Sequence, residues 1–233
     1  MNHITIVAGA RPNFMKIAPI IKEIIKQNKN GFDIDYSLIH TGQHYDKKMS
    51  GNFFNELNIP KPTLNLNAGG GTQAEQTSAI MIRFEDYLFK NNTDLVLVVG
   101  DVNSTMACAI VAQKMCIKVA HVEAGIRSND WTMPEEINRL VTDSITNYFF
   151  TTTKLASTNL LNSGHTKEKI FFVGNTMIDT LLANKSRFRK PSIWNHLELN
   201  KKKYFVITLH RPSNVDKETK LIEFINEIIR TSK

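Results

Sequence analysis

The stretch ITIVAGARPNFMKIAPIIKEII, residues 4–25, decides which fold this chain adopts. It opens with a short apolar run, Ile4 to Ala8, that has the composition of a buried strand. Gly9 ends that run, and apolar side chains then recur at helical spacing with charged residues between them. These apolar positions are Phe14, Ile17, Ile20, Ile21, Ile24 and Ile25. The stretch therefore predicts a strand, a tight turn and a helix.

The same alternation continues outward from this stretch to Val173. Further strands are expected at 35–40, 63–66, 95–99, 119–122, 148–151 and 170–173. Further helices are expected at 49–57, 72–90, 105–115, 134–145 and 154–161, and Thr72-Gln73-Ala74-Glu75 resembles a capping box. Strands and helices that alternate on this scale build an open parallel sheet with helices on both faces. We therefore expect an α/β fold over residues 1–173, a doubly wound parallel sheet of Rossmann-like type.

The pattern changes after Val173. A short helix at 177–183 is followed by basic, Pro-containing sequence, a single strand at 204–209 and a last helix at 217–230. One strand and two helices do not make a stable core. We expect residues 174–233 to open a second domain that is incomplete in this chain; the alternative is a terminal addition packed on the first domain.

Composition excludes several classes of protein. The chain has 233 residues, 42% of them hydrophobic and 22% charged, which is typical of a globular protein. No apolar stretch reaches the roughly 18 residues that a membrane span needs, and the basic start of a secretory signal is missing. The two cysteines, Cys108 and Cys116, are too few for a disulfide framework, and we expect both to be buried in a reducing cytoplasm.

The net charge of +7 suits partners that carry phosphate, although surface lysines that only keep a protein in solution give the same balance. No aromatic residues alternate with a basic stripe, as binders of single-stranded nucleic acid require, so nucleic acid is the weaker alternative. The histidines lack the spacing of a zinc-binding helix, and we expect no metal site.

Polar residues follow several of the predicted strands, where ligands bind in sheets of this kind. The first strand is followed by Gly9 to Lys16, the second by Gln43-His44, the fourth by Gly100-Asp101 and the fifth by Glu123-Ala124-Gly125. Because these strand ends meet at one edge of the sheet, we expect the residues to share one site.

Two cations, Arg11 and Lys16, lie at the start of the first helix. Backbone N–H groups and the helix dipole favour an anion there, and an arginine can hold two phosphate oxygens at once. The segment is neither a Walker loop nor a dinucleotide fingerprint, so a tight turn with surface cations is an equally good interpretation.

Three carboxylates are candidates for proton transfer: Asp101 and Glu123 at strand ends, and Glu135 at a helix start. Each has a plainer interpretation, which is weaker for Asp101 because this residue lies directly at the strand end. The residues after Asp101 are typical helix caps, and Glu123 is placed to pair with Arg127. Glu135 and Glu136 are also typical first-turn acids that offset the helix dipole, and for Glu136 we expect that exposed role.

Seven blocks of sequence, taken in order, resemble the non-hydrolysing UDP-N-acetylglucosamine 2-epimerase family. They are Gly9-Ala10-Arg11-Pro12 with Lys16, Gln43-His44, Gly100-Asp101, His121-Val122-Glu123-Ala124-Gly125, Pro134-Glu135-Glu136-Ile137-Asn138-Arg139, Gly174-Asn175-Thr176 and His210-Arg211-Pro212. The resemblance implies a glycosyltransferase-B-like architecture, in which two doubly wound domains enclose the active site. It also implies an isomerase that interconverts UDP-N-acetylglucosamine and UDP-N-acetylmannosamine for polysaccharide synthesis, without a metal or nicotinamide cofactor.

The resemblance further implies a role for each matching residue. Those that correspond to catalytic residues are Asp101, Glu123, Glu135 and His210. Those that correspond to substrate-binding residues are Arg11, Lys16, Gln43, His44 and Arg211. Tyr45-Asp46 departs from the more basic version found in members that bind a second, regulatory UDP-sugar. A UDP-sugar substrate, a homodimer and a cytoplasmic location are further expectations.

One departure from the family bears on activity. In the family, the second domain supplies most of the uridine and diphosphate site, including a late Ser-Gly-Gly…Glu-Glu segment that we do not find in this chain. We therefore expect little turnover from the 233 residues alone. Two alternatives stay open: a hydrolysing relative that releases UDP and free N-acetylmannosamine, and a non-catalytic chain that binds a partner.

Overall fold

The structure is a computed structural model and describes residues 2–42, 54, 57–209 and 212–231. The chain divides into two units, Met1–Ser186 and Arg187–Lys233. The first unit contains the sheet and those predicted site residues that the structure describes.

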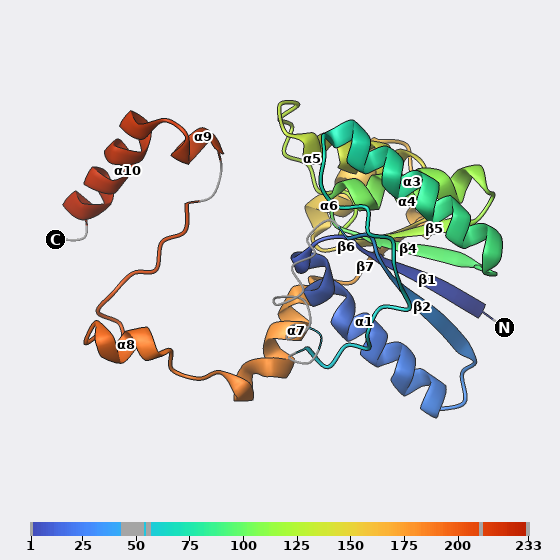
Figure 1. Ribbon diagram of the computed structural model, residues 1–233, viewed down its shortest axis with the longest axis horizontal. Coiled ribbons are helices and arrows are strands. Elements are labelled where there is room, and N and C mark those ends of the chain that lie inside the picture. The colour runs from blue at the N-terminus through green and yellow to red at the C-terminus, as the bar shows by residue number, and fades with distance from the viewer. Residues whose placement is uncertain (1, 43–53, 55–56, 210–211, 232–233) are drawn as a thin grey trace. The chain divides into compact units, whose positions relative to one another are not determined.

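A parallel sheet forms the centre of the first unit (Figure 1). Among the described residues it has seven strands, in the order β3-β2-β1-β4-β5-β6-β7. They are β1 (Asn2–Ala8), β2 (Ile34–His40), β3 (Leu64–Asn65), β4 (Leu95–Val99), β5 (Lys118–Val122), β6 (Tyr148–Thr151) and β7 (Ile170–Phe172). In the register, Ile6 of β1 stands between Leu38 of β2 and Leu97 of β4. The predicted doubly wound parallel sheet is confirmed.

Helices cover both faces of this sheet (Figure 1). In chain order they are α1 (Arg11–Lys29), α3 (Gln73–Lys90), α4 (Asn103–Lys114), α5 (Pro134–Ser144), α6 (Lys154–Asn162) and α7 (Thr176–Asn184), with short 3₁₀ helices at Lys167–Lys169 and Lys185–Arg187. The helix predicted at 49–57 lies mostly outside the described residues. The predicted capping box is present, because Thr72 Oγ1 accepts from the N–H of Glu75 and Glu75 Oε2 accepts from the N–H of Thr72.

Two apolar layers, one on each face, hold the helices against the sheet. Successive side chains of a strand point to opposite faces. Ile6 of β1 therefore packs in one layer with Phe14 and Ile17 of α1. Its neighbour Val7 packs in the other layer with Phe84 of α3. The helical stripe predicted from the opening stretch is thus the face by which α1 is attached to the sheet.

The strand order reverses at β1, and this reversal positions the candidate site. From β1 the chain proceeds outward to β2 and β3, then returns to β4 on the other side of β1. In doubly wound sheets, ligands bind outside the carboxyl ends of the strands at such a reversal. Here these ends are followed by Gly9 and Gly100.

The two cysteines differ in their surroundings. Cys108 of α4 is fully buried, and this burial raises the pKa of its thiol well above the ordinary value. Cys116 is exposed, because it lies in the turn after α4, where its φ is +61°. The expectation of burial is confirmed for Cys108 and wrong for Cys116.

The second unit contains the helices α8 (Ser192–His196), α9 (Pro212–Val215) and α10 (Glu218–Thr231). The strand predicted at 204–209 is not formed, and Phe205 and Val206 are each 80% exposed. A strand is held by hydrogen bonds to a neighbouring strand, and none pairs with this segment among the described residues.

The predicted division of the chain after Val173 stays a prediction. Helix α7, which follows that point, packs against α1 inside the first unit.

Among the described residues, no helix combines the length and the apolar character that crossing a membrane requires.

Candidate active site

The turn after β1 is packed closely against the start of α4. A Cβ atom on Gly9 would lie 2.1 Å from the Oγ of Ser104 and 2.9 Å from the Oγ1 of Thr41, so only glycine fits there. These two hydroxyls are themselves 2.7 Å apart and hydrogen-bonded. The ends of β1 and β2 and the first turn of α4 therefore meet at one point of the sheet edge.

Asn13 connects the first turn of α1 to the end of β4. Its Oδ1 accepts hydrogen bonds from the N–H groups of Gly9, at 3.1 Å, and Ala10, at 2.8 Å. Its Nδ2 donates to the carbonyl oxygen of Val99 at 3.2 Å. Because the side chain is buried and both of its polar atoms are bonded, the first turn of α1 has a fixed position beside β4.

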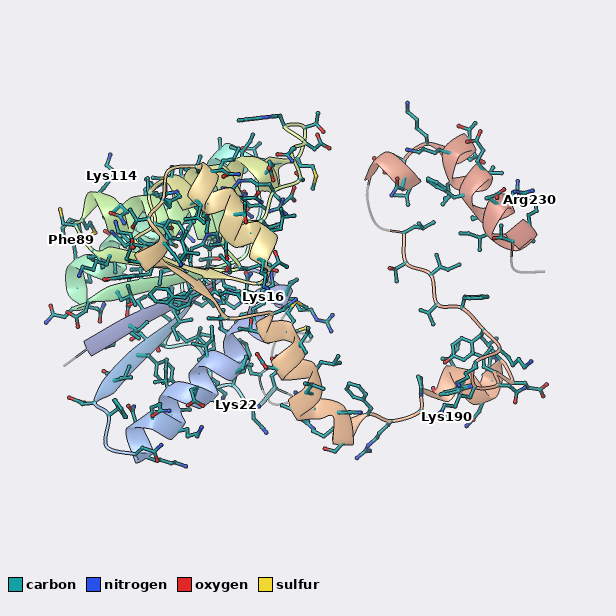
Figure 2. All side chains as sticks on the ribbon, turned by 180° about the vertical axis from the view of Figure 1, so that it is seen from behind. Lys16, Lys22, Phe89, Lys114, Lys190 and Arg230 are labelled. Atoms are coloured by element: carbon teal, nitrogen blue, oxygen red, sulfur yellow. The ribbon has the colours of Figure 1, made fainter. Side chains whose placement is uncertain are left out.

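The two predicted cations differ in burial. Arg11 is the first residue of α1 and is exposed. Lys16 is 9% exposed and lies near the edge of the sheet from which α1 begins, whereas Lys22 of the same helix is exposed (Figure 2). A buried ammonium group needs a partner of opposite charge.

That partner is Glu123. The Nζ of Lys16 forms an ion pair with Oε2 of Glu123, and the two side chains are only 11% and 19% exposed. Glu123 directly follows β5 and has a φ of +73°, in the left-handed region that side chains other than glycine rarely adopt. Its N–H donates to the carbonyl oxygen of Phe150 at 2.9 Å, which stabilises this conformation. The plainer interpretation of Glu123, in which it pairs with Arg127, is wrong, because Arg127 pairs with Asp143.

Gly100 leaves the space that this ion pair occupies. A Cβ atom on Gly100 would lie 3.1 Å from Nζ of Lys16 and 3.5 Å from Oε2 of Glu123. Gly100 also has a φ of +73°. Asp101, another of the predicted catalytic carboxylates, is the next residue. The Lys16–Glu123 ion pair therefore lies beside the residue that precedes Asp101.

Asp101 lies at the start of a chain of charges that leads to α5. It forms an ion pair with Nη2 of Arg139, whose Nη1 lies 2.9 Å from Oε2 of Glu136. The carboxylate of Glu136 also accepts hydrogen bonds from Ser128, at 2.9 Å from its N–H and 3.0 Å from its Oγ, and from the N–H of Asn129 at 3.1 Å. Burial raises the pKa of Glu136, but these hydrogen bonds outweigh burial and hold the pKa below its ordinary value.

The exposed role expected for Glu136 is therefore wrong. Glu136 is 1% exposed, whereas Glu135 is exposed. The reason is the rotation of α5 about its axis, which turns Glu136 toward the loop that contains Ser128 and Asn129. Glu135, the predicted catalytic residue, thus lies on the outer face of the first turn of α5.

A second buried network was not predicted. His121 lies in β5, with Nδ1 at 2.7 Å from Oδ1 of Asp143 and Nε2 at 2.8 Å from the carbonyl oxygen of Gly100. Asp143 accepts further hydrogen bonds from Arg127 and from the N–H of Gly125. The signal in the sequence was a histidine inside the otherwise apolar run predicted at 119–122, since a buried imidazole requires partners for its nitrogens.

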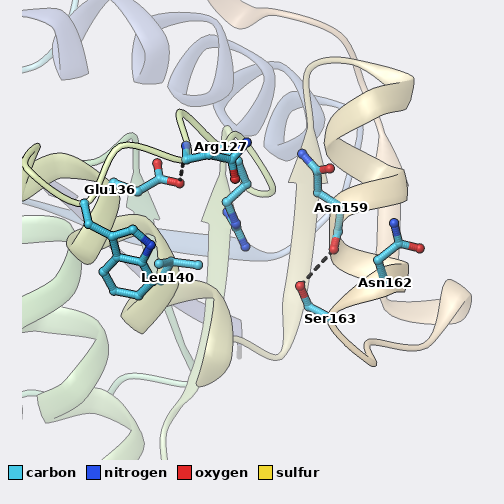
Figure 3. A pocket seen from close by; sticks show the side chains of 8 residues that line it. Arg127, Glu136, Leu140, Asn159, Asn162 and Ser163 are labelled. Atoms are coloured by element: carbon cyan, nitrogen blue, oxygen red, sulfur yellow. Dashed lines mark hydrogen bonds between the residues drawn. The ribbon is translucent and has the colours of Figure 1, made fainter.

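One pocket lies beside these residues, between α5, α6 and the loop before α5 (Figure 3). Its volume is about 230 Å³. The residues that line it are Arg127, Asn129, Trp131, Glu136, Leu140, Asn159, Asn162 and Ser163. It contains none of the residues predicted to be catalytic or to bind substrate.

The remaining predicted residues, Gln43, His44, His210 and Arg211, lie outside the described residues. Of the others, the structure brings Lys16 and Glu123 together and places Asp101 next to the glycine that they contact. Arg11 is five positions before Lys16 in the same helix, at the end where anions bind most readily. Carboxylates and cations at one sheet edge suit a reaction that moves a proton and releases an anion.

Comparison with known proteins supports this interpretation. The family model for UDP-N-acetylglucosamine 2-epimerase matches residues 26–233. A UDP-N-acetylglucosamine 2-epimerase from Methanocaldococcus jannaschii is 46% identical in a match that covers 97% of this chain and 62% of that protein. A UDP-2,3-diacetamido-2,3-dideoxy-D-glucuronate 2-epimerase from Pseudomonas aeruginosa is 40% identical, over 98% of this chain and 63% of that protein.

Solved structures lead to the same family. The crystal structure of Methanocaldococcus jannaschii UDP-GlcNAc 2-epimerase in complex with UDP-GlcNAc and UDP matches with a TM-score of 0.82 and 42% identity. The match covers 98% of this chain and 62% of that one, so the chain spans a little under two thirds of the length of these relatives. Because the family model matches most of the chain and the relatives are similar over nearly all of it, the chain belongs to the UDP-N-acetylglucosamine 2-epimerase family.

Proposed function

We propose that the whole protein, meaning the gene product with any sequence that follows Lys233, interconverts UDP-N-acetylglucosamine and UDP-N-acetylmannosamine. The observation that carries the proposal is the Lys16–Glu123 ion pair beside Gly100 and Asp101. A reaction that moves a proton at carbon and releases a diphosphate needs carboxylates and cations in one place. The substrate is supported by the family, one of whose solved members holds UDP-GlcNAc and UDP.

The proposed reaction begins at C1 of the sugar, because the proton at C2 is not next to a carbonyl group. The C1–O bond to the diphosphate breaks, and UDP leaves with the bonding electrons. The cationic C1 then acidifies C2, a carboxylate takes the C2 proton, and the C1–C2 double bond of a glycal forms. A second acid then donates a proton to C2 on the opposite face, UDP returns to C1 as the C1–O bond forms again, and the epimer results. One proton is removed and one is added, and UDP is released and recaptured, so the reaction balances without an oxidant or a reductant.

The residues of the first unit divide between these two tasks. Asp101, Glu123 and Glu135 are the proposed proton-transfer and cation-stabilising groups. Arg11 and Lys16 are the proposed partners of the departing diphosphate, because both lie in the first turns of α1. The ion pair with Glu123 keeps Lys16 at the sheet edge before substrate arrives. Carboxylate and cation are thus positioned in advance, which lowers the cost of reaching the transition state.

The proposal extends to residues that follow the first domain. We infer that residues 174–233 begin a nucleotide-binding domain. Within it, His210 is a proposed catalytic residue and Arg211 a proposed substrate-binding residue. In the first domain, Gln43 and His44 are further proposed substrate-binding residues. The greater length of the relatives supports this division. So do the exposed apolar side chains of the second unit, which a completed domain would bury. These are Phe205, Val206, Ile222, Ile225 and Ile229.

The proposal includes a homodimer. Ile82 and Phe89 have the i, i+7 spacing that places side chains on one face of α3, and they are 62% and 72% exposed. Removing such side chains from water favours association. We also propose a cytoplasmic location and a role in polysaccharide synthesis, because nucleotide-sugar substrates serve that synthesis in this family. Light scattering of the whole protein, with and without Ile82→Asp, tests the dimer.

Product analysis tests the function. The whole protein is incubated with UDP-N-acetylglucosamine, and the products are followed by proton NMR. The proposal predicts UDP-N-acetylmannosamine, approached from either sugar to the same equilibrium. Free N-acetylmannosamine with UDP would show a hydrolysing enzyme instead. The Pseudomonas aeruginosa relative justifies UDP-2,3-diacetamido-2,3-dideoxy-D-glucuronate as the competing substrate, and faster turnover of that sugar would overturn the substrate assignment.

A further inference from the structure

His121 connects helix α5 to the end of β4. It is fully buried in β5, and both of its ring nitrogens have partners. Nε2 lies 2.8 Å from the carbonyl oxygen of Gly100, and a carbonyl oxygen only accepts, so Nε2 donates this hydrogen bond. Nδ1 lies 2.7 Å from Oδ1 of Asp143, near the end of α5. The residue held through this contact, Gly100, directly precedes Asp101.

The second oxygen of Asp143 holds the end of β5. It accepts from the N–H of Gly125 at 3.1 Å and from Nη1 of Arg127 at 2.6 Å. Gly125 lies two residues after Glu123, and its carbonyl oxygen accepts from Nδ2 of Asn159 at 2.9 Å. Both polar backbone groups of Gly125, its N–H and its carbonyl oxygen, are therefore hydrogen-bonded to side chains.

The carboxylate of Asp143 thus contacts both loops that bear proposed proton-transfer groups. It reaches the Asp101 loop through His121 and the Glu123 loop through the N–H of Gly125. Asp143 is 1% exposed, so water does not compete for its hydrogen bonds. Burial raises its pKa, but the hydrogen bond and charge of His121 and the charge of Arg127 outweigh burial and keep the pKa below its ordinary value. An ionised carboxylate accepts from every one of its partners, and such charge-assisted bonds are the strong ones.

We propose that Asp143 is a positioning residue, which sets the separation of the Asp101 and Glu123 carboxylates by holding their loops through His121 and Gly125. This inference rests on the proposed function, because it assigns the two carboxylates to one reaction. Asp143 acts through the backbone of Gly100 and Gly125. Displacing a reacting group by about 1 Å through a remote mutation lowers turnover by roughly 10²-fold, so such a role has a measurable effect.

Asp143→Asn in the whole protein tests the role. The amide has nearly the same size, but it loses the charge and offers one acceptor oxygen in place of two. We expect kcat with UDP-N-acetylglucosamine to fall by roughly 10²-fold while KM changes far less, since the groups that bind substrate remain. Circular dichroism and the melting temperature establish that the variant is folded. A folded variant with unchanged kcat would overturn the proposal.

Thr142→Val is the matched control. Thr142 precedes Asp143 in α5 and is also fully buried, but its hydroxyl has no hydrogen-bond partner among the described residues. Valine has the same shape without the hydroxyl, so kcat and KM should both stay at the wild-type values. An equal loss of kcat in both variants would show that any change in buried α5 lowers activity, and this would contradict the proposal.

Rescue at His121 covers the case in which Asp143→Asn does not fold. His121→Leu removes the donor to Gly100, whereas His121→Gln keeps an N–H donor at the end of a side chain of similar length. We expect the glutamine variant to recover part of the kcat that the leucine variant loses. Equal loss in the two variants would contradict a role for the bond to Gly100.

Amide hydrogen exchange separates this proposal from the proposed function. In the 233-residue chain, Asp143→Asn should accelerate exchange at the Gly125 amide by roughly tenfold, the effect of losing one hydrogen bond, while Thr142→Val should not. An unchanged Gly125 rate would overturn the proposed link between α5 and the Glu123 loop, whatever the activity. An inactive wild-type whole protein with the expected exchange rates would instead overturn the proposed function.

Discussion

At the scale of single residues, two positions of the candidate site have a left-handed backbone conformation. Gly100 and Glu123 each have a φ of +73°, and both directly follow a strand of the sheet. Glycine adopts this conformation freely, whereas glutamate does so at a cost of roughly 1–3 kcal/mol. Such strain persists only where surrounding contacts hold it, and here the contacts are the ion pair with Lys16 and the hydrogen bond to Phe150.

We predict that Gly100→Ala weakens both stability and turnover. The left-handed backbone costs roughly 1–2 kcal/mol for a residue with a Cβ atom, and the new atom would lie 3.1 Å from Nζ of Lys16. Gly164→Ala is the matched control, because Gly164 has a φ of +90° and open space around it. Urea unfolding of both variants measures the difference. An equal loss of unfolding free energy in Gly100→Ala and Gly164→Ala would show that the contact of the new Cβ atom with the Lys16–Glu123 pair has no energetic cost.

Mutation of the two adjacent glutamates at the start of α5 should affect different properties, stability for Glu136 and turnover for Glu135. Glu136→Gln removes a buried charge that accepts several hydrogen bonds, so it should lower the free energy of unfolding by roughly 1.5–3 kcal/mol. Glu135→Gln, at an exposed position, should leave stability unchanged and lower kcat of the whole protein by roughly 10²-fold. Urea unfolding and steady-state kinetics test the pair. A destabilised Glu135→Gln beside a stable Glu136→Gln would contradict the orientation of α5.

At the scale of elements, a proline explains how α7 is attached to α1. Pro19 lies inside α1 and has no N–H group, so the carbonyl oxygen of Met15 lacks the donor that a helix normally provides four residues later. The hydroxyl of Thr180, in α7, donates to this oxygen at 2.6 Å. Thr180 is 4% exposed, so the bond is shielded from water. The attachment point is therefore next to Lys16.

We predict that the effects of Thr180→Val and Pro19→Ala are not additive. Thr180→Val leaves the partly buried carbonyl oxygen of Met15 without this donor, which should cost about 1–2 kcal/mol of unfolding free energy. When Pro19 is replaced by alanine, the new N–H can bond to Met15, so the same change at Thr180 should cost less. A double-mutant cycle measured by urea unfolding gives the coupling. A coupling of zero would show that Thr180 does not replace the missing helix donor.

The elements themselves were largely predictable from the sequence, whereas several contacts between them were not. Apolar runs located most strands, because a strand that is buried on both faces has a continuous apolar sequence. The segment 204–209 has such a run, yet no strand pairs with it in the part of the chain that the structure describes, and periodicity contains no information about partners. His121 and Asp143 are 22 positions apart, and the rotation of α5 that buries Glu136 depends on a loop. Both features require tertiary structure.

At the scale of the whole molecule, two buried carboxylates make the free energy of unfolding depend on pH in the acidic range. The pKa values of Glu136 and Asp143 lie below their ordinary values in the folded protein. The unfolded chain therefore binds protons at a higher pH than the folded protein does. Their stabilising contribution is complete above the ordinary values of 4.5 and 3.8, and it is lost as pH falls through the lower values of the folded state.

We predict that the free energy of unfolding decreases between about pH 5 and about pH 3, and that Glu136→Gln decreases less steeply over the same range. The variant starts from a lower stability at neutral pH because it has already lost the charge. Urea unfolding across this range measures both slopes. Equal slopes in the wild-type protein and the variant would show that Glu136 does not contribute to acid unfolding.

Deuterium incorporation at C2 tests the central claim most directly, namely that Asp101 and Glu123 belong to a site for proton transfer at carbon. The whole protein is incubated with UDP-N-acetylglucosamine in D₂O, and the C2 proton is followed by NMR. We predict that both epimers acquire deuterium at C2 and that Asp101→Asn and Glu123→Gln each slow this exchange by roughly 10²-fold, whereas Glu85→Gln, at an exposed position of α3, does not. Wild-type exchange in the two site variants, or no C2 deuterium in the wild-type product, would contradict the account.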